Sequence, residues 1–193
     1  MEFGTKNINR TNGFLNITGM NDYAAYKRIR RAKDNGTLLH LKRGLYADPL
    51  NLVNVMIDIE SVVPKGIVCL YNAWAYYRLT TKVPPGFCVA VESKRKVTIP
   101  DVLPVTLYYW KKENLEFGVV KTEVSGHNVR ITDLERSVCD AIKYRNKIGM
   151  DLCAEIVKSY LNRNDRNISK LCIYAKKLRV YNTLTHYLEF AMV

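Results

Sequence analysis

Glu92 and Lys94 directly follow an apolar, strand-like run, a placement found in metal-dependent nucleases. In such enzymes a strand-end carboxylate binds Mg²⁺, and the lysine steadies the attacking water. The site also needs a second carboxylate, but the nearest upstream acids, Asp58 and Glu60, fall in a predicted helix. Because glutamate and lysine at strand ends are more often plain solvated residues, a nuclease that uses Glu92 and Lys94 is kept only as an alternative.

A second group of acids comprises Asp133, Glu135 and Asp140. The order Thr132-Asp133-Leu134-Glu135 has the form of a capping box, in which Thr132 binds the third helical amide and Glu135 reaches back. Capping therefore explains the first two acids without catalysis, and Asp140 falls on another part of the helical wheel. The chain contains no G-x-S-x-G or P-loop motif, and no nucleophile–base pair follows from spacing. We expect no catalytic residue, no enzymatic activity and no cofactor.

The cysteines and histidines form no metal-binding pattern. The 5 cysteines and 3 histidines are well separated, and neither C-x-x-C nor H-E-x-x-H occurs. Single cysteines among apolar residues are typical of reduced, mostly buried thiols. We therefore expect no metal site. The cysteines are Cys69, Cys88, Cys139, Cys153 and Cys172.

Net charge is the strongest compositional signal. The 193 residues include 30 Lys and Arg against 18 Asp and Glu, a formal net charge of +12 at pH 7. This excess favours an anionic partner, nucleic acid before membrane. No apolar run reaches the ~20 residues that a membrane-spanning helix needs, and the amino terminus has no signal-peptide core. We expect a cytoplasmic protein without a membrane partner.

The basic residues concentrate between Asn21 and Ala47. A helix is predicted over 21–34, capped by Asn21 and ended by Asn35-Gly36, because apolar residues recur at i, i+4 and i+7. These apolar residues are Ala25, Ile29 and Ala32. The opposite face carries Tyr23, Lys27, Arg30 and Arg31, with Arg28 and Lys33 on the flanks.

Two short strands are predicted to follow this helix, over 38–41 and 45–47, around the turn Lys42-Arg43-Gly44. A basic helix followed by a basic-tipped hairpin suits the second half of a winged helix, with the helix in the major groove and the tip on a phosphate or the minor groove. A solvated basic face has the same pattern. The preceding stretch, 6–19, is a poor helix former. It holds either a very short helix over 6–12 or a trimmed motif.

The rest of the chain predicts an α/β (α+β) fold, with a larger mixed-sheet domain and a helical carboxy-terminal part. We expect domains over 1–48 and 49–193, with residues 1–5 resembling the remnant of a cloning site. The expected helices cover 50–62, 67–79, a segment opening at 132–135, 150–162, 168–178 and 181–191. The expected strands cover 87–91, 105–110, 119–124 and 128–131.

Three stretches carry a family resemblance. They are 39–46, ending Arg43-Gly44-Leu45-Tyr46; 79–84, leading into the strand at 87–91; and 129–140, which reads V-R-I-T-D-L-E-R-S-V-C-D. Together they resemble the AbiEi antitoxin family of bacterial and archaeal abortive-infection systems, over a region from about Phe14 to the end. The last stretch is the most specific, because it matches the family's "V-T-D-x-E-R-T-(hydrophobic)-x-D" signature.

The resemblance implies a DNA-binding winged helix followed by a larger antitoxin domain. Such proteins repress their own operon and counter a nucleotidyltransferase-like toxin encoded beside them, which a type IV antitoxin need not bind directly. The resemblance assigns the recognition-helix role to Tyr23, Lys27, Arg30 and Arg31, and the wing role to Lys42 and Arg43. It gives a structural role to Thr132, Asp133, Glu135 and Arg136, namely capping and an ion pair that ties helix to sheet.

A further alternative is a basic interaction module that binds RNA or an acidic protein without operator binding. The basic residues of the carboxy-terminal helices could serve it. They are Lys158, Arg163, Arg166, Lys170, Lys176, Lys177 and Arg179.

Overall fold

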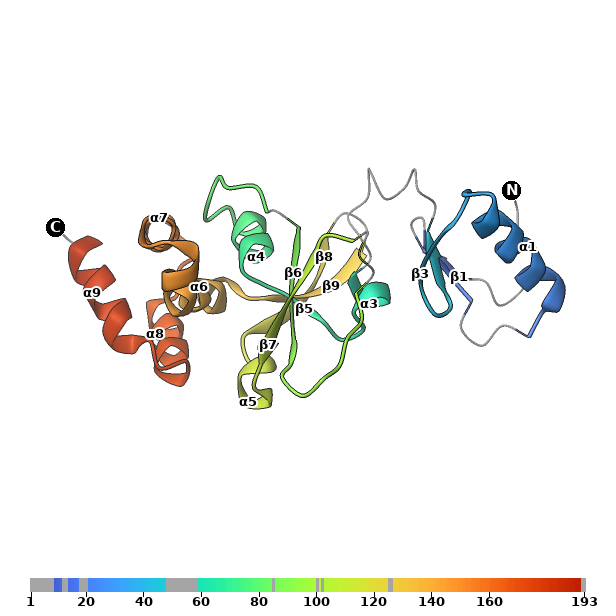
Figure 1. Cartoon of the computed structure of the whole chain (residues 1–193). Helices are drawn as coiled ribbons and strands as arrows, with labels where there is room; N and C mark the ends of the chain where they lie inside the picture. Colours follow the sequence, from blue (N-terminus) through green and yellow to red (C-terminus); the bar gives the residue numbers. More distant parts are fainter. Residues whose placement is uncertain are drawn as a thin grey trace. The chain divides into compact units, whose positions relative to one another are not determined.

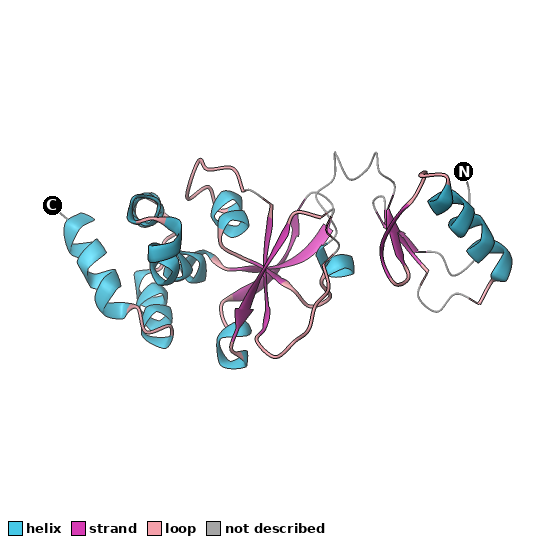
Figure 2. Ribbon diagram, in the orientation of Figure 1, coloured by secondary structure: helices cyan, strands magenta, loops and turns pink. Residues whose placement is uncertain are grey.

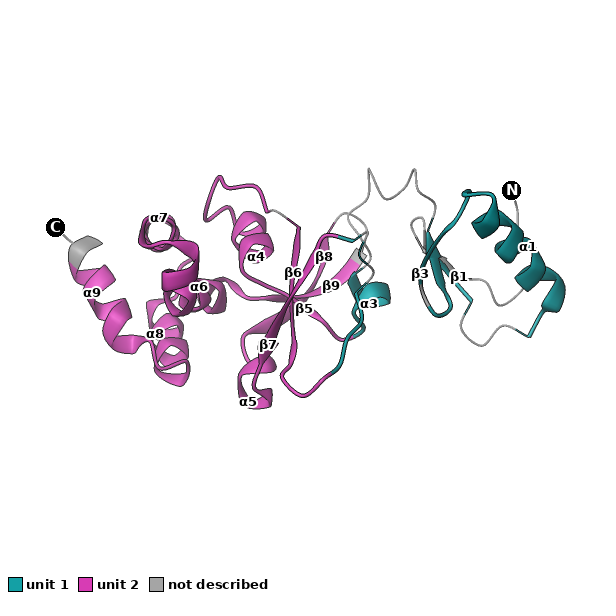
Figure 3. Ribbon diagram, viewed as in Figure 1, with its two compact units in different colours: residues 1–64, 96–103 teal, residues 65–95, 104–193 magenta. Residues whose placement is uncertain are grey.

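The computed structural model describes residues 9–11, 14–17, 21–47, 59–84, 86–99, 101, 103–124 and 127–191. The chain divides into two compact units (Figure 3). The N-terminal unit comprises 1–64 and 96–103, and the C-terminal unit comprises 65–95 and 104–193. The domain boundary expected after residue 48 falls in 48–58, outside the described residues, and stays a prediction.

The N-terminal unit has a four-stranded antiparallel sheet with the order β1-β2-β4-β3. The elements are β1 (Asn9–Thr11), β2 (Phe14–Asn16), α1 (Tyr23–Asp34), β3 (Leu39–Lys42), β4 (Leu45–Ala47) and α3 (Ile59–Val62). The short helix considered over 6–12 is wrong for residues 9–11, because they pair with β2 as a strand. Within the described part of 9–47, α1 is the only helix. Of the helix expected over 50–62, only the end is described, as α3.

The C-terminal unit has a five-stranded mixed sheet with the order β7-β6-β5-β9-β8 (Figure 1). Its strands are β5 (Ile67–Val68), β6 (Phe87–Glu92), β7 (Val105–Trp110), β8 (Val119–Val124) and β9 (His127–Thr132). The β5–β9 and β6–β7 pairs are parallel, and the β5–β6 and β8–β9 pairs are antiparallel.

The helices of this unit lie mainly after the sheet in the chain, and Figure 2 shows them in cyan beside the magenta strands. They are α4 (Tyr71–Tyr76), α5 (Lys112–Leu115), α6 (Leu134–Ile148), α7 (Met150–Leu161), α8 (Ile168–Lys177) and α9 (Tyr181–Ala191). The predicted α/β class, mixed sheet and helical carboxy-terminal part are confirmed. No helix in the described ranges combines the length and apolarity needed to cross a membrane.

The helix predicted over 67–79 is wrong at its start. Ile67 and Val68 form the central strand β5, between β6 and β9, and α4 begins only at Tyr71. Both residues are buried and β-branched, which suits a strand buried on both faces. Pairing with the two neighbouring strands outweighs the helical spacing of the apolar residues in this segment.

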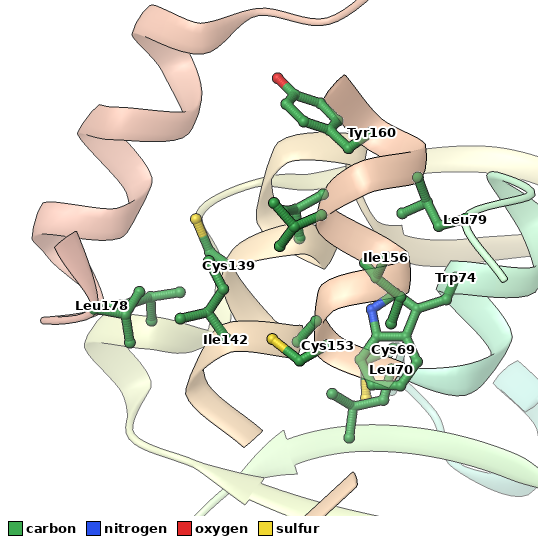
Figure 4. Close-up of a cluster of buried hydrophobic side chains, with 14 of the residues drawn as sticks. Cys69, Leu70, Trp74, Leu79, Cys139, Ile142, Cys153, Ile156, Tyr160 and Leu178 are labelled. Atoms are coloured by element: carbon green, nitrogen blue, oxygen red, sulfur yellow. The ribbon is translucent and has the colours of Figure 1, made fainter. Parts of the chain in front are cut away.

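The core of the C-terminal unit joins α4 to helices α6–α9 (Figure 4). Trp74 is fully buried, and its indole nitrogen donates a hydrogen bond to the carbonyl of Ser137 at 2.9 Å, which fixes α4 on α6. The apolar side chains on one stripe of α6 are buried, namely Leu134, Val138, Ala141 and Ile142. All five cysteines are free and four are buried, as predicted, and burial raises the pKa of the Cys69 and Cys139 thiols.

Candidate nucleic-acid interface

Helix α1 has well-defined ends. The Asp22 carboxylate accepts hydrogen bonds from the amides of Ala24 at 2.9 Å and Ala25 at 3.1 Å, so Asp22 is the N-cap. The prediction of Asn21 as the cap is wrong by one residue. An aspartate has the further advantage that its charge interacts favourably with the helix dipole. At the other end, the predicted stop is confirmed, because Asn35 is the C-cap and Gly36 has φ +72°.

One face of α1 anchors the helix on the sheet of the N-terminal unit. Ala25 and Ile29 are buried, and Ile29 packs with Leu15, Ile17 and Tyr46. Ala32, predicted on the same face, is half-buried. Because burial of an isoleucine stabilises by about 1.5–3 kcal/mol, this contact fixes the rotation of the helix. The residues on the opposite side must therefore face solvent.

The outer face of α1 is basic and exposed. The predicted recognition residues Tyr23, Lys27, Arg30 and Arg31 are all exposed, and so are Arg28 and Lys33 on the flanks. In the part of the chain that the structure describes, no acidic side chain forms an ion pair with any of them. The Lys27 ammonium lies 5.4 Å from the centre of the Tyr23 ring, which is 72% exposed. The helix thus presents five exposed cations that have no acidic partner among the described residues and can neutralise phosphates.

The predicted hairpin is confirmed as β3 and β4. Lys42 pairs with Leu45, so Arg43 and Gly44 form a two-residue tip, and Gly44 has φ 78°, which suits glycine. Arg43 is exposed at this tip. Lys42 is the last residue of β3, and its side chain lies outside what the structure describes. The Gly44 carbonyl accepts a hydrogen bond from the Ile17 amide at 2.7 Å, which holds the tip on the chain segment after β2.

The capping box predicted at the start of α6 is wrong in its detail. Asp133 is the N-cap and accepts the Arg136 amide at 2.8 Å, because strand β9 continues through Thr132. The Thr132 hydroxyl lies 2.8 Å from the Ser137 hydroxyl. Glu135 does not reach back. Its carboxylate instead pairs with the Lys170 ammonium of α8 at 2.9 Å.

Arg136 is buried and multiply bound. Its Nε donates to both Asp140 oxygens, at 2.9 and 3.1 Å, and its Nη1 donates to the carbonyls of Asn114 and Phe117. The guanidinium carbon lies 4.6 Å from the centre of the Trp110 ring. Burial raises the pKa of Asp140 to about 6, although Arg136 opposes the rise. These contacts join α6 to the segment between β7 and β8.

Only part of this network has a signal in the sequence. The Arg136–Asp140 pair has a local signal, the i, i+4 spacing of opposite charges. Lys170 had no such signal, because it comes from a helix far along the chain and meets both Asp133 at 3.1 Å and Glu135. Every buried carboxylate here has a cationic partner, and this arrangement is typical of a structural brace.

The alternative pair of candidate catalytic residues, Glu92 and Lys94, lies at the end of a strand. Glu92 ends β6, and Lys94 is exposed just after it. Of the two upstream acids, Asp58 lies outside the described residues and Glu60 belongs to the N-terminal unit. Within the described ranges, no three His, Cys, Asp or Glu side chains are grouped so that they could hold a metal ion.

Fold and site together define a two-unit α/β protein with a basic helix and hairpin in its smaller unit. No protein-family model matches the chain, and no curated protein matches its sequence. Function must therefore be argued from the site itself.

Proposed function

We propose that this protein binds double-stranded DNA through α1 and the β3–β4 hairpin. The observation that carries the proposal is the outer face of α1, where five exposed Lys and Arg side chains lack an acidic partner in the described residues. Ile29 on the opposite side holds this face outward. An α-helix fits the major groove, where arginine reads guanine and lysine and arginine neutralise flanking phosphates.

The burial pattern of α1 favours DNA over a membrane surface. A helix that lies in a membrane interface inserts a broad apolar face among the lipids. In α1 the apolar residues Ala25 and Ile29 are already buried in the N-terminal unit. What remains exposed is cationic, with Tyr23 and Tyr26 as the large exposed apolar side chains. Affinity for a polyanion needs only these charges.

We further propose that the protein is the antitoxin and autorepressor of an AbiE-type, type IV system. This step rests on the resemblance of residues 129–140 to the family signature. The cap made by Asp133 and the buried Arg136–Asp140 pair support a structural role for the signature residues. The cognate toxin would be a nucleotidyltransferase-like protein encoded beside it, countered with or without direct contact.

A matched pair of variants tests the DNA interface. Arg30→Ala/Arg31→Ala removes two charges from the outer face of α1. Because each lost phosphate contact lowers the log–log salt slope by about 0.9, the slope of binding to promoter DNA should fall by about 2. Lys158→Ala/Lys176→Ala removes the same charge from exposed positions on α7 and α8.

The control variant should bind the promoter as tightly as the wild type. Equal losses in both variants would contradict recognition by α1 and indicate attraction by net charge. A larger loss in Lys158→Ala/Lys176→Ala would instead favour the alternative, in which the C-terminal unit binds the anionic partner. That alternative has one observation behind it, since the sequence of this unit carries 20 Lys and Arg against 11 Asp and Glu.

A further inference from the structure

The C-terminal unit contains a pocket of about 430 Å³ between the end of α4, the loop that follows it and α7. Its volume falls in the range of small-molecule sites, about 300–1,000 Å³. Its polar lining includes Arg78, Lys82, Thr81 and Ser159. No residue assigned to DNA binding and no residue of the stretch 129–140 lines it, although the loop belongs to the stretch 79–84 that shares in the family resemblance.

The pocket has a rigid floor. After α4 the chain turns sharply, with the Leu79 amide donating to the Trp74 carbonyl at 2.8 Å. Leu79 is fully buried in the same core cluster as Trp74 and Ile156 (Figure 4). The loop is also tied directly to α7, because the Thr81 amide donates to the Glu155 carboxylate at 3.3 Å. The backbone of this loop therefore keeps its position relative to α7.

The pocket lining carries two cationic side chains against one acidic side chain. Arg78 and Lys82 are exposed, and neither side chain has an ion pair or hydrogen bond within the described ranges. Glu155 is the one acid in the lining, and one of its oxygens already accepts the Thr81 amide. The hydroxyls of Thr81 and Ser159 likewise have no partner among the residues that the structure describes. Two cations and two hydroxyl donors thus line one concave surface.

We propose that this pocket binds the phosphate group of a small phosphorylated molecule. A phosphomonoester carries about −1.5 to −2 charge at pH 7 and three strong acceptor oxygens, which match the two cations and the hydroxyls. Arg78 can bind two of these oxygens with its guanidinium fork, and Lys82 supplies a point charge. Ala75, Val83 and Pro84 form an apolar wall for the organic part of the ligand.

The backbone conformation at Arg78 allows a substitution that removes the side chain without straining the turn. Arg78 has φ 55° at the end of α4, and Arg179 has φ 59° at the end of α8. Glycine adopts this conformation without strain, so Arg78→Gly removes the guanidinium and keeps the turn. Arg179→Gly removes the same charge from the same kind of turn, but outside the pocket lining. A loss of binding in Arg78→Gly that is absent in Arg179→Gly therefore reports the missing guanidinium and not unfolding.

The test is a titration of the full chain by heteronuclear NMR with ribose 5-phosphate, inorganic phosphate and ribose. Ribose 5-phosphate should shift the amides of Thr81, Val83 and Ser159 saturably, and ribose should not. Since a charge-assisted hydrogen bond is among the strongest contacts in such a site, Arg78→Gly should weaken binding by about tenfold or more. Arg179→Gly should stay within about twofold, because distant surface charges are screened.

Two results would overturn the proposal: no saturable binding of either phosphate compound, or an equal loss in Arg78→Gly and Arg179→Gly. Inorganic phosphate that binds as tightly as ribose 5-phosphate would support the site and identify free phosphate as sufficient. Tighter binding of ribose 5-phosphate would support it and identify an organic phosphate as the ligand. The outcome is independent of DNA binding, because the whole lining belongs to the C-terminal unit.

Discussion

Replacing Arg136 should destabilise the C-terminal unit severely. The side chains of Arg136 and Asp140 are each only 1% exposed, so Arg136→Met leaves a buried carboxylate without its cation. The carbonyls of Asn114 and Phe117 lose a donor in the same step. Removing one partner of a buried ion pair typically costs about 3–5 kcal/mol. This is a large share of the about 5–15 kcal/mol that stabilises a domain.

Urea denaturation followed by tryptophan fluorescence measures this loss directly. Both tryptophans of the chain, Trp74 and Trp110, are buried in the C-terminal unit, so the signal reports the unfolding of that unit alone. With a urea m-value of about 1–3 kcal/mol/M, the midpoint should fall by at least about 1 M. Glu116→Ala, which breaks the exposed pair with Arg130, should cost less than about 1 kcal/mol.

The single variant Asp140→Leu and the double variant Arg136→Met/Asp140→Leu complete the thermodynamic cycle. Replacing both charged partners by apolar residues removes the unpaired carboxylate, so the double variant should be more stable than Arg136→Met alone. If Arg136→Met costs no more than Glu116→Ala, or if Asp140→Leu fails to restore any stability, the buried pair is not the brace inferred from its contacts.

Two further predictions concern a helix cap and pH. Asp22→Ala should destabilise the N-terminal unit by about 1 kcal/mol in thermal denaturation followed by circular dichroism, whereas Asn21→Ala should have little effect; equal effects would contradict the observed cap. Burial raises the pKa of Asp140 from 3.8 to about 6, so the folded state keeps this proton at a higher pH than the unfolded chain does. The contribution of Asp140 to stability is therefore full below about pH 4 and is lost as pH rises through 6. The difference in unfolding free energy between the wild type and Asp140→Asn should change across this window, and a constant difference would refute the shift.

Local patterns were enough to predict α1 and the β3–β4 hairpin. The i, i+4 spacing of Ala25 and Ile29 and the glycines at positions 36 and 44 report on the backbone within a few residues. Both cap predictions missed by one position, at Asn21 against Asp22 and at Thr132 against Asp133. When two adjacent residues can both cap a helix, the path of the preceding chain decides which of them does so.

Long-range contacts account for what the sequence could not predict. Ile67 and Val68 form a strand only because β6 and β9 lie on either side of them. Lys170 reaches Glu135 from another helix, and the pocket depends on the loop after α4 meeting α7. No period or motif within a single segment encodes such contacts.

The most direct test of DNA recognition is a salt titration of binding to DNA from the protein's own promoter, against a scrambled duplex of equal length. We predict tighter binding to the promoter at every salt concentration, with a steep log–log slope for both duplexes. Equal, weak binding to the two duplexes would contradict sequence recognition by α1. The basic face would then attract DNA only through non-specific electrostatic interactions.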